Sequence, residues 1–97
     1  MTLKILVVDN HPMILKLLAN FLEKEGHEVM TASDGLAALS VLEVYTPDIV
    51  FVDLVMPNIG GDKLCRIIRS IPKFKKLFIV VLSMADDFQD VFLDGFD

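Results

Sequence analysis

A chain of 97 residues with a formal net charge of −5 has room for one small domain and is a poor candidate for direct contact with nucleic acid. Although 54% of the residues are hydrophobic, no apolar stretch reaches the roughly 18 residues of a membrane span, and the N-terminus lacks the features of a signal peptide. The single cysteine, Cys65, allows no internal disulfide, so we expect a cytoplasmic protein that contacts no membrane.

Strand-like and helix-like segments alternate along the chain. In chain order, the pattern predicts a strand at 3–8, a helix at 11–25, a strand at 28–31, a helix at 36–42, a strand at 48–53, a helix at 60–71, a strand at 77–82 and a helix at 86–94. Gly26 suits the end of the first helix, and Ser33 or Asp34 suits the N-cap of the second. Alternation of this kind predicts an α/β domain with a doubly wound parallel sheet and helices on both faces.

Three of the predicted strands end in a residue that can carry chemistry. Asp9 follows the first strand, Asp53 ends the third and Ser83 follows the fourth. Ligands gather at the carboxyl ends of the strands in an open parallel sheet, so we expect the two carboxylates and the hydroxyl to meet in one pocket. The alternative is that Asp9 is a loop cap and Asp53 an ordinary turn residue.

Two carboxylates held close together repel each other unless a cation or a shared proton lies between them. Mg²⁺ suits this role because it prefers oxygen ligands and often needs only one or two carboxylates. Asn10 follows Asp9 and can add a neutral carbonyl oxygen. The pattern therefore predicts an acidic, metal-assisted site for phosphoryl chemistry.

The segment around Asp53 resembles the phosphoacceptor loop of response-regulator receiver domains, the CheY-like superfamily. Their pattern is a strand followed by Asp-x-x-Met-Pro-x-x-x-Gly, and residues 52–61 read Val-Asp-Leu-Val-Met-Pro-Asn-Ile-Gly-Gly. Residues 5–12 resemble the acidic first loop of the family, 32–39 the start of its second helix, and 80–84 the strand that presents its switch hydroxyl. The resemblance covers the whole chain in order and spacing.

The resemblance implies a flavodoxin-like sheet with strand order 2-1-3-4-5. It implies that a sensor histidine kinase or a phosphotransfer protein phosphorylates Asp53. Mg²⁺ would be held by Asp9, Asp53, the backbone carbonyl of Val55 and, weakly, Asn10. Ser83 would bind the phosphoryl group and switch a signalling surface. Such a domain assists its own phosphorylation and dephosphorylation, turns over no separate substrate, and acts on an output domain or protein without touching nucleic acid itself.

Three positions depart from the family pattern. Asn10 stands where the family usually has a second acid, which predicts weaker Mg²⁺ binding, and Gly60 stands where an acidic residue is common. The lysine and proline that end strand five in the family have no counterpart in the chain. The resemblance therefore implies that residues 1–97 form a receiver domain truncated before its fifth βα unit. The fourth strand would then be an open apolar edge, which favours a homodimer or strand exchange.

Two other classes of function stay open. The chain can be a receiver-like binding or dimerisation module that does not depend on phosphate, which Asn10 and the missing lysine favour. It can also be a small magnesium phosphohydrolase, although such enzymes usually carry a second acid two residues after the nucleophile, where this chain has Val55. His11, beside the acidic site, either influences the metal and phosphoryl chemistry or simply caps a helix or faces solvent.

Overall fold

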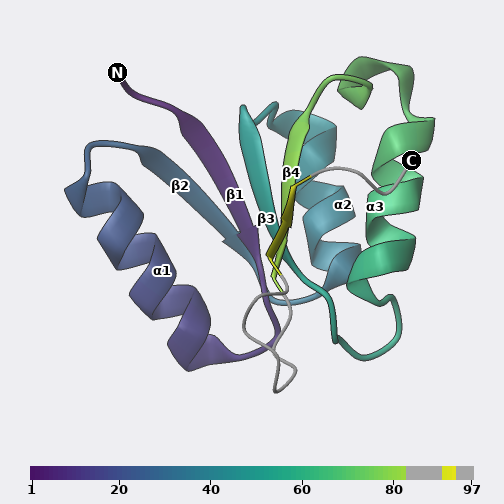
Figure 1. Ribbon diagram of the computed structural model, residues 1–97, viewed down its shortest axis with the longest axis horizontal. Coiled ribbons are helices and arrows are strands. Elements are labelled where there is room, and N and C mark those ends of the chain that lie inside the picture. Colours follow the sequence, from purple (N-terminus) through teal and green to yellow (C-terminus); the bar gives the residue numbers. More distant parts are fainter. Residues whose placement is uncertain (83–90, 94–97) are drawn as a thin grey trace.

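The computed structural model, which describes residues 1–82 and the backbone of residues 91–93, has one sheet with helices on both faces (Figure 1). The strands are β1 Lys4–Val8, β2 Glu28–Ala32, β3 Ile49–Asp53, β4 Phe78–Leu82 and β5 Val91–Leu93. The helices are α1 Pro12–Lys24, α2 Gly35–Val44 and α3 Gly61–Ser70, with a 3₁₀ turn η1 at Pro72–Phe74. No helix among these residues is both long and apolar enough to cross a membrane.

The sheet has the order β2-β1-β3-β4-β5, and β1 to β4 run parallel. The order 2-1-3-4 that the sequence predicted for the parallel strands is therefore confirmed. Helix α1 covers one face of the sheet, and α2 and α3 cover the other (Figure 1). All four parallel strands point their carboxyl ends to the same edge, and this edge positions the candidate site.

The central strand β1 is buried on both faces, which explains why its sequence is apolar at nearly every position. Ile5 and Val7 belong to a smaller core beneath α1. Leu6 and Val8 belong to a larger core that the strands share with α2 and α3. The site is thus built on the most firmly buried part of the sheet.

The predicted helix ends are confirmed by local geometry. The Asp34 carboxylate caps α2, because its Oδ1 accepts a hydrogen bond of 2.7 Å from the Ala37 N–H. Gly26 follows α1 with φ of 95°, a conformation that glycine adopts without strain. Pro12 is the first residue of α1, where its missing N–H breaks no helical hydrogen bond.

The predicted last helix is wrong at Val91–Leu93, and its other residues lie outside those that the structure describes. Val91–Leu93 form the strand β5, which pairs antiparallel with Val80–Leu82 of β4. The prediction of an open edge at the fourth strand is therefore also wrong along Val80–Leu82. The physical reason is that an edge strand offers unpaired backbone groups, and here the chain's own later segment satisfies them.

The turn between β3 and α3 brings two backbone segments into close contact at Gly61. Its N–H donates a hydrogen bond of 2.9 Å to the carbonyl of Leu54. A Cβ atom at Gly61 would collide with the Asp53 carbonyl oxygen and would lie only 2.7 Å from Leu54 Cα. Since both neighbours are backbone atoms, they cannot move aside as a flexible side chain does.

We expect Gly61→Ala to lower the free energy of unfolding by about 3 kcal/mol, because the added methyl group forces the β3–α3 turn apart. Gly60→Ala is the matched control, since its Cβ would meet the Asp62 side chain at 3.2 Å and backbone only at 3.6 Å. Urea unfolding monitored by circular dichroism measures both variants. Equal destabilisation of the two would contradict the close approach at Gly61.

Candidate functional site

Two carboxylates lie side by side at the carboxyl edge of the sheet. Asp53 is the last residue of β3, and Asp9 directly follows β1, which pairs with β3 in parallel. The two residues are almost completely buried, with exposed fractions of 1% for Asp9 and 0% for Asp53. The structure thus brings together the two acids that the sequence placed at neighbouring strand ends.

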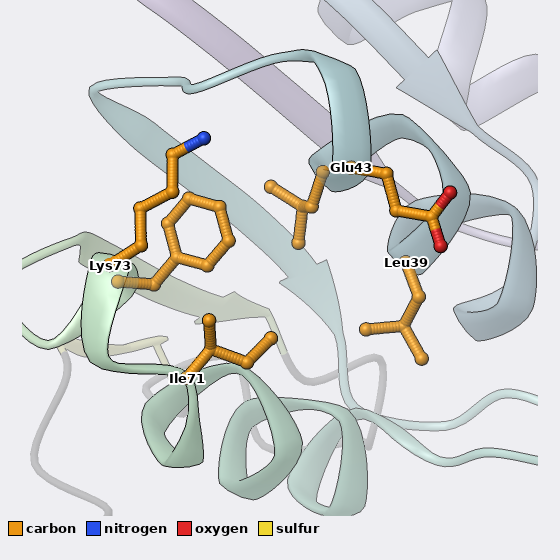
Figure 2. A pocket seen from close by; sticks show the side chains of 6 residues that line it. Leu39, Glu43, Ile71 and Lys73 are labelled. Atoms are coloured by element: carbon orange, nitrogen blue, oxygen red, sulfur yellow. The ribbon is translucent and has the colours of Figure 1, made fainter.

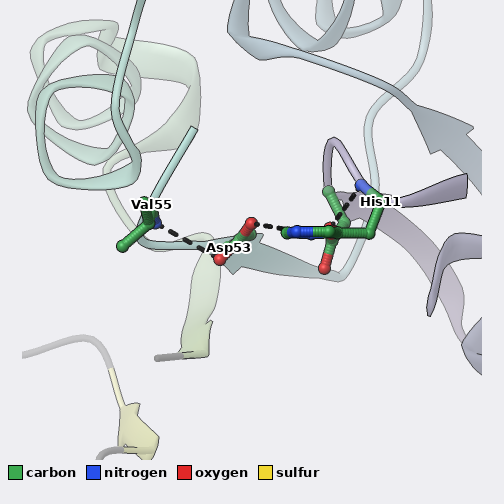
Figure 3. Close-up of polar contacts among 4 residues, drawn as sticks. His11, Asp53 and Val55 are labelled. Atoms are coloured by element: carbon green, nitrogen blue, oxygen red, sulfur yellow. Dashed lines mark hydrogen bonds and ion pairs between the residues drawn. The ribbon is translucent and has the colours of Figure 1, made fainter. Parts of the chain in front are cut away.

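The imidazole of His11 lies against this pair of carboxylates. Its Nδ1 is 2.8 Å from Oδ1 of Asp9 and 3.7 Å from Oδ2 of Asp53. The backbone N–H of His11 also donates to Oδ1 of Asp9, at 2.8 Å. Figure 3 shows the ring of His11 pointing toward Asp53, with Val55 on the far side of the carboxylate. One ligand atom from each of Asp9, His11 and Asp53 lies within 4.8 Å of the other two.

Among the residues that the structure describes, three buried oxygens in or next to the site have no hydrogen-bond partner: Oδ2 of Asp9, Oδ2 of Asp53 and Oδ1 of Asn10, the residue after Asp9. The other oxygen of Asp53, Oδ1, accepts a bond of 3.2 Å from the Val55 N–H. Buried polar atoms without partners are rare in folded proteins. Carboxylate and amide oxygens are the ligands that Mg²⁺ prefers, so the residues present fit such an ion.

The electrostatics of the pair follow from this burial. Burial raises the pKa of the Asp53 carboxyl above its ordinary value, and the neighbouring charge of Asp9 raises it further. The Val55 N–H and the His11 ring act in the opposite direction and only partly offset the rise. Without a bound cation, the ionised form of Asp53 is therefore held in an unfavourable environment.

Strand β4 ends at Leu82. The next residue, Ser83, carries the predicted switch hydroxyl and lies outside the residues that the structure describes. Its predecessor Leu82 is the register partner of Asp53. The Leu82 carbonyl accepts a hydrogen bond of 2.8 Å from the Leu54 N–H, which extends the β3–β4 pairing past Asp53. Val55 contributes its N–H to the site, and a role for its carbonyl stays a prediction.

His11 is the residue whose position sequence reasoning did not resolve. It occupies the N-cap position of α1, but its side chain makes no cap hydrogen bond there. Instead, Oδ1 of Asp9 accepts a hydrogen bond from the backbone N–H of His11, two residues later. This turn places the His11 ring next to the two carboxylates. The spacing of Asp9 and His11, two residues apart in the sequence, was the feature that could have predicted this contact.

An apolar pocket of about 240 Å³ lies between α2 and η1 (Figure 2). It is lined by Leu39, Leu42, Glu43, Ile71, Lys73 and Phe74. The C-terminal half of α2 and the η1 turn both lie near the amino ends of the strands that follow them, so this pocket is at the opposite edge of the sheet from Asp53. None of the predicted site residues in the described part of the chain lines it.

Replacing Asp53 by asparagine should remove the unfavourable buried charge. Because the folded-state pKa of Asp53 is raised, its carboxyl stabilises the fold fully below the ordinary value of 3.8, and that stabilisation is lost as the pH rises through the raised pKa. In metal-free buffer with EDTA, we expect Asp53→Asn to be more stable than the parent at about pH 7, with a difference that shrinks toward about pH 4.

Urea unfolding across this pH range measures the difference. Asp62→Asn is the control, because the Asp62 side chain is 52% exposed. A difference for Asp53→Asn that did not change with pH would show that the buried charge is not its cause.

Comparison with known proteins places this geometry in a family. Residues 5–94 match the response regulator receiver domain. PilG of Pseudomonas aeruginosa is 35% identical over 88 residues, which cover 91% of this chain and 65% of PilG. The alkaline phosphatase synthesis transcriptional regulatory protein PhoP of Bacillus subtilis is 38% identical over 87 residues, 90% of this chain and 35% of PhoP. The chain therefore spans less than two thirds of the length of either relative.

The same likeness holds among solved structures. The response regulator protein TrrA of Thermotoga maritima, in a crystal structure in complex with Mg(2+)-BeF, superimposes with a TM-score of 0.76 and 39% identity. The superposition covers 82% of this chain and 68% of that structure. Since the family model covers residues 5–94 and solved receiver structures share the fold, the chain belongs to the response regulator receiver domain family.

Proposed function

We propose that this receiver domain accepts a phosphoryl group on Asp53 from the phosphohistidine of a sensor histidine kinase or a phosphotransfer protein. The observation that carries the proposal is the Asp53 carboxylate itself, which is buried at the end of a central strand. One of its oxygens accepts a hydrogen bond, and the other has no hydrogen-bond partner in the described part of the chain. Membership of the receiver family supports it. The domain then works as a signalling module and turns over no separate substrate.

The two oxygens of Asp53 have different roles in this proposal. The Val55 N–H fixes Oδ1, which leaves Oδ2 free to attack phosphorus. A bond forms between Oδ2 and phosphorus while the phosphorus–nitrogen bond of the donor breaks, and the donor imidazole keeps the electron pair and takes up a proton. The attacking carboxylate must be ionised, although its surroundings favour the neutral form.

Asp9, Asp53, the amide oxygen of Asn10 and the backbone carbonyl of Val55 are the groups that would hold Mg²⁺. The buried oxygens of Asp9, Asn10 and Asp53 that lack a hydrogen-bond partner among the described residues support this assignment. When bound, the ion supplies positive charge that offsets the carboxylates and the transferring phosphoryl group. The complex of TrrA with Mg(2+)-BeF supports a magnesium site in a related receiver domain.

Ser83 is proposed as the hydroxyl that responds to phosphorylation. It follows Leu82, the register partner of Asp53, directly in the sequence. A phosphoryl group adds strong acceptor oxygens and about −1.5 to −2 charges near neutral pH, which is enough to reorder a neighbouring loop. The signal would pass to an output domain or protein, as the longer relative PhoP, a transcriptional regulator, suggests.

The proposal is tested by incubating the full chain with acetyl phosphate and Mg²⁺ and measuring the intact mass. We expect a gain of one phosphoryl group that disappears in Asp53→Asn and with EDTA, because the nucleophile or the cation is then missing. Asp62→Asn, which changes an exposed carboxylate, should be phosphorylated like the parent. No gain in the parent, or an equal gain in Asp53→Asn, would contradict the proposal.

Asn10→Asp tests the metal site separately. The substitution puts a second negative charge beside Asp9, so half-maximal phosphorylation should need about tenfold less Mg²⁺, equivalent to about 1.4 kcal/mol. Asn20→Asp is the matched control, since Asn20 lies exposed on α1. An unchanged Mg²⁺ requirement in Asn10→Asp would show that residue 10 does not contribute to metal binding.

A further inference from the structure

The acidic site contains the imidazole of His11, a possible nitrogen ligand for a metal ion that a Mg²⁺ site does not require. Nδ1 of His11 lies 2.8 Å from Asp9 Oδ1 and 3.7 Å from Asp53 Oδ2. The ring is not engaged in capping α1, and about half of the side chain is exposed, so water and ions can reach it. The proposed phosphoryl transfer gives this imidazole no role.

The spacing of the three groups suits a common metal ion. First-row ions bind protein nitrogen and oxygen at about 2.0–2.2 Å, which places neighbouring ligand atoms about 3 Å apart. The two measured separations lie on either side of that value. The buried Oδ2 atoms of Asp9 and Asp53 have no hydrogen-bond partner within the described residues, which independently indicates that the site can bind a positively charged ligand.

The donor set decides which ion the site prefers. Carboxylate and carbonyl oxygens suit Mg²⁺, whereas imidazole suits Zn²⁺ and other ions later in the first row. The two carboxylates therefore suit Mg²⁺, but the imidazole is a ligand that an oxygen-preferring ion binds poorly. Asn10, a neutral amide, further lowers the charge available to hold Mg²⁺.

We propose that Asp9, His11 and Asp53 form a binding site for a divalent late first-row transition ion such as Zn²⁺, with Nδ1 of His11 as a direct ligand, and that this ion competes with Mg²⁺ for the two carboxylates. In the ion-free state, Nδ1 lies 2.8 Å from Oδ1 of Asp9. A ring nitrogen that binds a metal ion carries no hydrogen, so in the bound state the His11 ring would carry its hydrogen on Nε2. The inference rests on the metal site of the proposed function but not on phosphoryl transfer.

Isothermal titration calorimetry of the full chain with Zn²⁺ and with Mg²⁺ tests the selectivity. In His11→Gln, we expect Zn²⁺ affinity to fall by at least about tenfold while Mg²⁺ affinity changes by less than about twofold. His27→Gln is the matched control, because His27 is the second of the two histidines and bonds to the Leu3 N–H away from the acids. Equal Zn²⁺ affinity in His11→Gln and the parent would overturn the proposal.

Co²⁺ as a coloured substitute for Zn²⁺ tests direct ligation. We expect the visible absorption band of bound Co²⁺ to shift in His11→Gln but not in His27→Gln, because only the first change removes a nitrogen ligand. An identical spectrum in His11→Gln would overturn direct ligation even if the affinity had fallen. Urea unfolding of the ion-free variants confirms that each still folds.

The same samples separate this inference from the proposed function. If acetyl phosphate with Mg²⁺ fails to phosphorylate Asp53 but Zn²⁺ binding depends on His11, the proposed function is wrong and the ion site stands. If Asp53 is phosphorylated but His11→Gln does not change Zn²⁺ binding, the proposed function stands and the proposed ion site is wrong. Asp9→Asn should weaken both ions, and unchanged Zn²⁺ binding in that variant would also overturn the proposed ligand set.

Discussion

The structure depends on two buried carboxylates that the sheet holds side by side. Asp9 and Asp53 stand at the ends of neighbouring strands, so their separation is set by the sheet and not by flexible loops. The hydrogen bonds beyond the strand ends keep them there: the Asp9 N–H continues the pairing with Ala32, and the Leu54 N–H continues it with Leu82. Because the strands hold the two carboxylates in place, the carboxylates cannot move apart to relieve their repulsion. A bound cation would therefore stabilise the site.

The hydrophobic core maintains this unfavourable arrangement. Leu6 and Val8 of β1 and Val50 and Val52 of β3 are fully or almost fully buried, and they lie on the strands that lead into the two acids. Burial of apolar side chains stabilises a fold by roughly 1.5–3 kcal/mol for each fully buried large residue. A sheet packed on both faces can therefore tolerate a repulsive pair at its edge, as functional sites often require.

The sequence was sufficient to locate the acids, because alternating strands and helices imply a parallel sheet, and parallel strands share one carboxyl edge. It did not place the His11 ring, since that depends on a turn in which the Asp9 side chain bonds to the backbone two residues later. It also misassigned Val91–Leu93, because a short apolar run fits a helix or a strand equally well and only the neighbouring β4 edge decides between them. The tight contact at Gly61 was equally invisible, since it depends on how α3 approaches the end of β3.

The two cores of the sheet are unequal, and the parts of the site are divided between them. Asp9 and Asp53 extend strands that help build the larger core, whereas His11 precedes α1, whose packing rests on the smaller core of Ile5, Val7 and Leu22. Segments with fewer buried contacts open first in local fluctuations of a native protein. Partial detachment of α1 would therefore carry the imidazole away while the carboxylate pair stays in register. The carboxylate pair is therefore the more persistent part of the site, whereas the position of the His11 ring depends on how firmly α1 is packed.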